Sequence, residues 1–300
     1  MRFFRFGYLS AYQGGIYAAV VMMFLAFILP SKGPDDTINL ILTISTFLFA
    51  ILAGFILTRQ NSRFDNVREL LTKLDAVWKS LYHTFGLFGT KIQNKSADII
   101  DAAYISAYDF ELWNYQKAEI FGDIFSTVYE FINKLKPKTA AQKGAVEVML
   151  NKLENIEVTE HQVGEIAKEK LMISEWAILY ILSGIILFCV FYMKVFTVYS
   201  FLFTILLSTA ICFVLFIIRD LNNLRLKGEL LAYESGQKVF DTIDKMRYYH
   251  AEDLFAMVAP KKGKFRVGMH SPGEKPRIVI CSSDEDWKSK IKTLRKAKKK

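Results

Sequence analysis

The chain has 300 residues and a net charge of +9 at pH 7; 52% of its residues are hydrophobic and 23% are charged. Its three cysteines are too few and too scattered for a disulfide framework, which excludes the small disulfide-rich secreted proteins. The hydrophobic residues are collected in long uncharged runs, which argues against an ordinary soluble globular protein.

Four uncharged apolar runs predict transmembrane helices. They form two pairs, Gly15–Pro30 with Ile38–Leu57, and Trp176–Tyr192 with Val195–Ile218. Each run holds roughly 16 to 24 residues, which at about 1.5 Å per residue crosses, or nearly crosses, a bilayer core of about 30 Å. Buried core helices of a soluble protein are the alternative, but these runs carry no charge on any face.

Lys and Arg residues near the ends of these runs lie almost entirely on one side of the predicted membrane. The opposite side offers only Lys32 and Lys194, in the two short connections. Such residues favour the cytoplasmic side of a membrane. We therefore expect a multi-pass protein of the cell (inner) membrane, with both termini and the middle of the chain in the cytoplasm.

The middle of the chain shows helical periodicity. Apolar residues recur at steps of three and four from Phe64 to Phe85, and no Pro or Gly interrupts Phe55–Phe85, so the second span should leave the membrane as one long rod. A second stripe covers Phe121–Leu135 and stops before Pro137, and a third helix is expected over Ala140–Ile156.

These elements predict an all-α fold of four transmembrane helices in two hairpins, with a cytoplasmic helical domain between them. The expected parts are an N-terminal segment with the first hairpin (1–57), the cytoplasmic domain (58–172), the second hairpin (173–218), C-terminal cytoplasmic helices (219–260) and a basic tail (261–300).

The tail holds most of the net charge, with fourteen Lys or Arg against four Asp or Glu. A basic tail in the cytoplasm can bind anionic lipid headgroups, or it can be an ordinary solvated end. Nucleic acid is not an expected partner, because no RNA- or DNA-binding motif is present. Two short strands are expected over Lys264–Met269 and Pro276–Cys281, around the turn Pro272-Gly273. The candidate lipid-binding residues are Lys261, Lys262, Lys264, Lys298, Lys299 and Lys300.

Catalytic chemistry has little support. The four histidines are scattered singly, with no second ligand at metal-site spacing, and neither a phosphate-binding loop nor a nucleophile elbow is present. We therefore expect no enzyme, no metal site and no cofactor. The centres of the spans carry no ionisable residue, which a transporter would need. The functions that remain compatible with these spans are passive permeation, sensing and scaffolding.

Two stretches carry a resemblance to a known family. The segment Gly54–Glu69 is similar to the bestrophin signature after the second helix, with its arginine, its aromatic-Asp pair and its glutamate in place. The segment Arg219–Asn223, followed by Gly228, is similar to the stretch after the last helix of a broader bestrophin-like family. Val67 and Arg68 replace the tryptophan pair of the bestrophin signature.

This resemblance implies an anion channel, usually a pentamer, whose pore is lined by the second span. One alignment places Phe47, Ile51 and Phe55 at a hydrophobic neck; a shifted alignment places Ala50, Gly54 and Thr58 there. The first set stands at i, i+4 and i+8, hence on one helix face, where rings of side chains from several copies can close a pore by dewetting. The implied cytoplasmic vestibule is lined by Arg59, Asn61, Arg63, Asp65 and Glu69.

The neck residues and the vestibule residues can each have a purely structural role instead. The apolar stripe can pack against the other spans, and the arginines can pair with Asp65 or Glu69 along the helix.

The function predicted from these features is a passive anion (chloride) channel of bestrophin-like type. It would be a homo-oligomer, with membrane lipids and chloride or other small anions as partners. The main alternative is a non-conducting membrane scaffold or signalling protein, which recruits a partner or anionic lipid through its cytoplasmic helices and basic tail. A weaker alternative is an enzyme that acts on lipid at the membrane surface.

Overall fold

The computed structural model describes residues 10–109, 119–226, 229–250, 263–269, 277–282, 286–287 and 289–290. The chain divides into two compact units. The first combines Met1–Asp65 with Glu169–Gly228, and the second combines Asn66–Lys168 with Glu229–Lys300. Each unit is described by itself.

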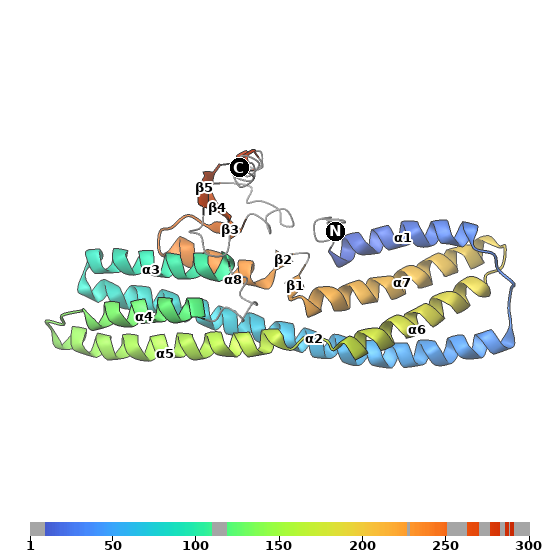
Figure 1. Cartoon of the computed structure of the whole chain (residues 1–300), viewed down its shortest axis with the longest axis horizontal. Helices are drawn as coiled ribbons and strands as arrows, with labels where there is room; N and C mark the ends of the chain where they lie inside the picture. The colour runs from blue at the N-terminus through green and yellow to red at the C-terminus, as the bar shows by residue number, and fades with distance from the viewer. Residues whose placement is uncertain are drawn as a thin grey trace. The chain divides into compact units, whose positions relative to one another are not determined.

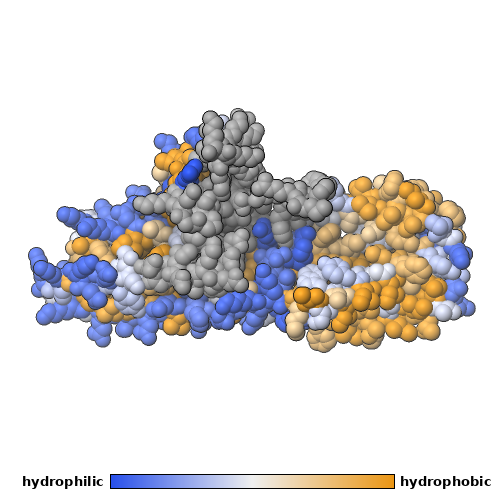
Figure 2. Space-filling model, in the orientation of Figure 1, coloured by the Kyte–Doolittle hydropathy of each residue, from blue (hydrophilic) through white to orange (hydrophobic). Residues whose placement is uncertain are grey.

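The first unit contains helices α1 (Ala11–Ile28), α6 (Ile173–Tyr192), α7 (Val198–Asn222) and the first part of α2 (Asp36–Phe85) (Figure 1). Among the described residues, these four helices are long and apolar enough to cross a membrane. They coincide with the four runs predicted from the sequence. Figure 2 shows a broad hydrophobic surface over this unit. Only 17–28% of the most apolar stretch of each helix is buried inside the chain, as expected where lipid or other subunits cover the rest.

An apolar core joins α2, α6 and α7 in this unit. Phe49, Ala53 and Ile56 of α2 pack with residues of α6 and α7, which include Leu179, Ile186, Ile211 and Ile218. Helix α1 contacts α7 through small residues instead. A Cβ atom added to Gly14 would lie 2.9 Å from the Phe216 ring, and one added to Gly15 would lie 2.7 Å from the Phe213 ring. Small residues at this face therefore permit the close approach of the two helices.

The second unit is built around the remainder of α2. It adds the short 3₁₀ helix Gly86–Phe88 (η1) and the helices α3 (Thr90–Asp109), α4 (Glu119–Asn133) and α5 (Ala140–Lys168). Helix α2 contacts α3 through Trp78 and Tyr104, whose rings lie 6.4 Å apart, and α4 through Phe85 and Phe131, whose rings lie 5.3 Å apart. It contacts α5 through Lys152, which donates to the Thr84 hydroxyl at 2.8 Å.

The predicted rod is confirmed, because α2 runs without interruption to Phe85. The end of α4 ahead of Pro137 also agrees with the sequence. Helix α5 continues to Lys168, beyond the predicted end at Ile156. Helix α3 was not predicted. Its buried residues include the small Ala97 and Ala103, which give only a weak periodic hydrophobic signal.

The C-terminal part of the chain adds a small β-sheet to a mainly helical fold. After the short strands β1 (Arg225–Leu226) and β2 (Glu229–Leu230), helix α8 (Leu231–Thr242) leads to β3 (Tyr248–His250). Strand β4 (Phe265–Met269) pairs in parallel with β3 and antiparallel with β5 (Arg277–Cys281). The two predicted strands are confirmed, and the fold as a whole is helical, as the sequence predicts.

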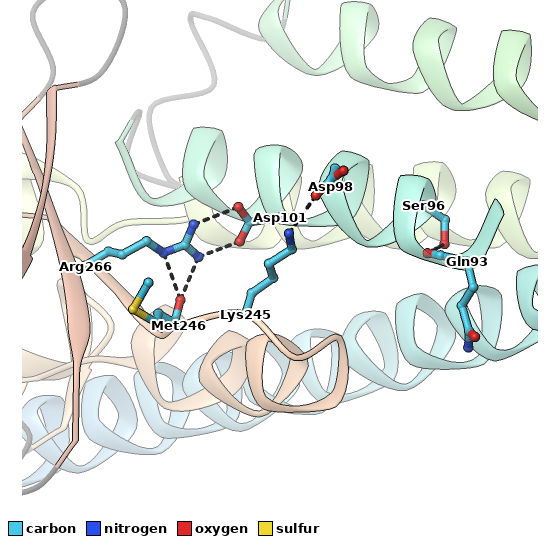
Figure 3. Close-up of polar contacts among 7 residues, drawn as sticks. All are labelled: Gln93, Ser96, Asp98, Asp101, Lys245, Met246 and Arg266. Atoms are coloured by element: carbon cyan, nitrogen blue, oxygen red, sulfur yellow. Dashed lines mark hydrogen bonds and ion pairs between the residues drawn. The ribbon is translucent and has the colours of Figure 1, made fainter. Parts of the chain in front are cut away.

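This sheet is attached to helix α3 by charged side chains (Figure 3). The Arg266 guanidinium donates to both oxygens of Asp101, at 2.7 and 2.5 Å, and to the carbonyl of Met246. The Lys245 ammonium lies 2.6 Å from Asp98. Trp287 is only 2% exposed. The described part of the predicted basic tail is therefore folded. Of the candidate lipid-binding lysines, Lys264 is exposed and the other five lie outside the described residues.

Gly268 is required by the packing of this sheet, because a Cβ atom at this position would overlap the buried ring of Tyr248. We expect Gly268→Ala to destabilise the sheet by roughly 1–3 kcal/mol, the usual cost of overpacking. Faster hydrogen–deuterium exchange in peptides that cover β4 and β5 measures this. The control is Gly144→Ala on α5, where a Cβ atom meets open space. Unchanged exchange in Gly268→Ala would contradict the packing described.

Glu160 on α5 gives the second unit a pH dependence. Its partial burial, with a smaller contribution from Glu157, raises the pKa of Glu160 to about 8. Because this pKa lies above that of the unfolded chain, the folded state is favoured at low pH and loses stability as the pH rises from about 4.5 through about 8.

We expect Glu160→Gln to stabilise the protein at about pH 9 and to leave its stability nearly unchanged at about pH 4.5, because an amide cannot ionise. Thermal unfolding at both pH values measures the difference. Glu147→Gln, at an exposed position of the same helix, serves as the matched control. An equal effect of Glu160→Gln at both pH values would show that this carboxyl is not the titrating group.

Candidate functional site

Helix α2 has one buried face from Ser45 to its end at Phe85. The buried positions recur every three or four residues, so they lie on one side of the helix. In the first unit they are Ser45, Phe49, Ala53, Ile56, Gln60, Arg63 and Phe64; in the second they continue as Val67, Leu71, Leu74, Trp78, Leu81 and Phe85. This stripe fixes the rotation of α2, and it thereby determines which residues point away from the chain.

The residues predicted for the neck lie on the opposite face. Phe47 is 65% exposed, Ile51 is 44% exposed and Phe55 is 73% exposed. None of the three belongs to the apolar core of the unit. Within one chain, these three side chains are therefore not buried against the other spans. Ala50, Gly54 and Thr58, the residues of the shifted alignment, are exposed as well.

The polar residues of the predicted vestibule separate into two groups. Asn61, Asp65 and Glu69 are exposed on the outward side of α2, and the Asn61 amide donates to the Asp65 carboxylate at 3.1 Å. These three residues continue the face that carries Phe47 and Ile51.

Arg59 is directed toward helix α6. Its guanidinium lies 2.8 Å from Glu175, and the same carboxylate accepts a hydrogen bond from the backbone of Met172 at the start of α6. The predicted pairing of Arg59 along its own helix is thus replaced by a pair between two helices. The Arg59 side chain is 52% exposed, so this pair contributes little to stability.

Arg63 is a correction to the vestibule. It is only 4% exposed, and its guanidinium donates to the Gln60 side chain at 3.0 Å and to the Asn222 carbonyl at 3.2 Å. The Asn222 side chain in turn accepts from the backbone of Leu171 at 2.8 Å. We call Gln60, Arg63, Leu171 and Asn222 the polar cluster. It connects α2, the end of α7 and the segment before α6, and it removes Arg63 from any solvent-filled space.

The position of Arg63 could have been found from the sequence. Arg63 follows Ile56 by seven residues, two helical turns, and therefore lies on the buried side of α2. Its positive charge suggested a vestibule, whereas its helical phase places it on the buried side.

Asp220, in the segment Arg219–Asn223 that carries part of the family resemblance, holds the start of α1. Its carboxylate accepts a hydrogen bond from the Ala11 backbone at 2.7 Å, at the start of α1, where the helix dipole favours a negative charge. Arg219 pairs with the same carboxylate at 2.8 Å and stacks on the Phe216 ring. The segment that carries the family resemblance thus connects α7 to α1.

Within the described ranges, no group of three or more His, Cys, Asp or Glu residues converges as a metal site would require. The first unit has three features that bear on function: the apolar core, the buried polar cluster and the exposed outward face of α2.

Residues 15–224 match the model of the bestrophin-like domain, and the chain belongs to this family. The match covers most of α1 and all of α2, α6 and α7, and it ends before α8 and the C-terminal sheet. No curated protein and no solved structure matches the chain.

We expect the polar cluster to stabilise the first unit more than the exposed ion pair does. Arg63→Met should lower the free energy of unfolding by about 2 kcal/mol, because it leaves buried hydrogen-bond acceptors without their charged donor. Arg59→Met, the matched control, should cost less than about 1 kcal/mol. Thermal unfolding of the detergent-solubilised variants compares the two. A larger loss for Arg59→Met would contradict the assignment.

Proposed function

We propose that this bestrophin-like membrane protein is a passive ion channel whose pore is lined by the exposed face of α2 from several copies of the chain. The observation that carries the proposal is the outward position of Phe47, Ile51 and Phe55, opposite the buried stripe of the same helix.

Several copies of α2 around an axis would stack these three side chains into apolar rings. Residues four apart rise by about 6 Å, so the three rings would form a neck about 12 Å long. A constriction of this kind can stop ions by excluding water, without any charged group. The family resemblance suggests a pentamer.

The composition of this face supports a pore more than a lipid contact. Thr43 and Thr58 are exposed above and below the three large side chains, and Gly54 lies among them. Asn61 and Asp65 then continue the face with polar groups. Alternating hydroxyl, small and large apolar side chains suit a water-filled path with a constriction.

Chloride is the ion that the resemblance implies. The charged residues predicted for the vestibule count against chloride, however, because Arg63 is buried and Arg59 is paired with Glu175, whereas Asp65 and Glu69 are exposed. A mouth lined by carboxylates raises the local concentration of cations. The test of the channel must therefore measure chloride and potassium separately.

The scaffold alternative is favoured by the C-terminal part of the chain. It folds outside the bestrophin-like match, and its strand β5 exposes the apolar residues Ile278 and Ile280. A non-conducting protein would use such a surface, together with the basic tail, to recruit a partner or anionic lipid.

We expect liposomes that contain the purified protein to pass ions, and Phe47→Ala/Ile51→Ala/Phe55→Ala to pass them faster, because shorter side chains widen and hydrate the neck. Separate chloride and potassium flux assays measure the rate and the selectivity. The matched control replaces Phe203, Leu206 and Leu207, three exposed apolar residues of α7, by Ala. If neither the wild type nor the neck variant conducts while both remain folded oligomers, the channel proposal is wrong and the scaffold alternative is favoured.

A further inference from the structure

An apolar groove lies between α1 and α6, near the connections Leu29–Asp35 and Met193–Thr197. Its volume is about 490 Å³, within the usual range of about 300–1,000 Å³ for ligand sites. Met22 and Leu25 of α1 form one wall, and Leu187, Phe188 and Phe191 of α6 form the other. Every one of these side chains is apolar, and the groove is distinct from the exposed face of α2.

The groove has the length and chemistry of a lipid chain site. From Met22 to Leu29, α1 rises by about 10 Å, most of the depth of one leaflet of a bilayer core of about 30 Å. Phe191 is 7% exposed and closes the floor, whereas Phe188 is 59% exposed at the edge. An extended acyl chain can enter along the helices from the surrounding membrane.

Among the described residues that line the groove, Lys32 and Tyr192 carry polar side-chain groups, and their end of the groove is its mouth. The Lys32 ammonium lies 5.9 Å from the centre of the Tyr192 ring, and the Lys32 backbone donates to the Tyr192 carbonyl at 3.0 Å. This hydrogen bond fixes the connection after α1 against the end of α6. Lys and Tyr are the residues that meet headgroups at a membrane interface.

The second cation near the groove, Lys194, already binds groups of the protein. Lys194 is only 2% exposed; its ammonium donates to the backbone carbonyls of Ala26 and Leu29 and lies 4.9 Å from the Phe201 ring. Lys32 is exposed and lies in no ion pair within the described ranges. The nearby Asp35 carboxylate accepts a hydrogen bond from the backbone of Ile38, at the start of α2.

We propose that this groove binds an anionic phospholipid, with one acyl chain between α1 and α6 and the headgroup at Lys32 and Tyr192. An apolar trough that ends in a single exposed cation matches a hydrocarbon chain that ends in a negative charge. The uncharged middle of a span from a second copy would fill the trough but would bring no negative charge to the Lys32 ammonium.

The test uses nanodiscs of phosphatidylcholine with a small fraction of phosphatidylglycerol that carries a photoreactive group on one acyl chain. After illumination, peptide mapping by mass spectrometry locates the label. We expect label on the peptides that contain Met22–Leu29 and Leu187–Tyr192. Unlabelled phosphatidylglycerol should compete for this site about fivefold better than phosphatidylcholine, the ratio that corresponds to about 1 kcal/mol for one interfacial cation.

Two variants separate the parts of the proposal. Leu187→Trp fills the groove and should abolish the label there. The control Phe203→Trp, also about one and a half turns from the connection between α6 and α7, should leave the label in place. Lys32→Gln should retain the label but lose the preference for phosphatidylglycerol; because Lys32 is exposed, this variant does not depend on repacking.

Helical circular dichroism and gel filtration establish that each variant is folded. Label spread evenly over the exposed apolar residues would overturn the proposal, and so would equal competition by the two lipids in the wild type. Cross-links from Met22→Cys to a second copy of the chain would assign the groove to a subunit interface instead.

Discussion

The buried face of α2 is the constraint on which the rest of the structure depends. A single stripe, repeated every three or four residues from Ser45 to Phe85, packs first against α6 and α7 and then against the helices of the second unit. Because the rotation of a helix is shared by all its residues, burial of Phe49, Ala53 and Ile56 forces Phe47, Ile51 and Phe55 outward. The proposed neck is thus a consequence of how the core is packed.

The same constraint separates the two arginines that the resemblance placed in a vestibule. Arg63 has the phase of the buried stripe and takes part in the polar cluster, where its hydrogen bonds compensate for its burial. Arg59 stands at the edge and pairs with Glu175. Of the charged residues predicted for the vestibule, Asp65 and Glu69 are thus exposed on the outward face, whereas the two arginines are buried or paired with another helix.

The predictability of the fold followed the strength of each hydrophobic pattern. The four spans and the rod of α2 could be predicted because large apolar residues recur without interruption. Strands β4 and β5 could be predicted because a Pro-Gly pair separates two short apolar runs, whereas β3 lies in a part of the chain (219–260) that was expected to be helical. Helix α3 could not, since small residues such as Ala97 and Ala103 bury little surface. The ion pair of Arg266 with Asp101 joins residues 165 positions apart, and no local pattern signals such a pair. For the site, helical phase identifies the outward face, but residue type alone misplaced Arg63.

An electron cryo-microscopy structure of the purified protein in lipid nanodiscs tests the central claim most directly, because it shows what covers the outward face of α2. The account predicts a symmetric homo-oligomer in which Phe47, Ile51 and Phe55 of every copy face the symmetry axis. A structure in which these side chains face lipid, or pack against a helix away from the axis, would contradict it.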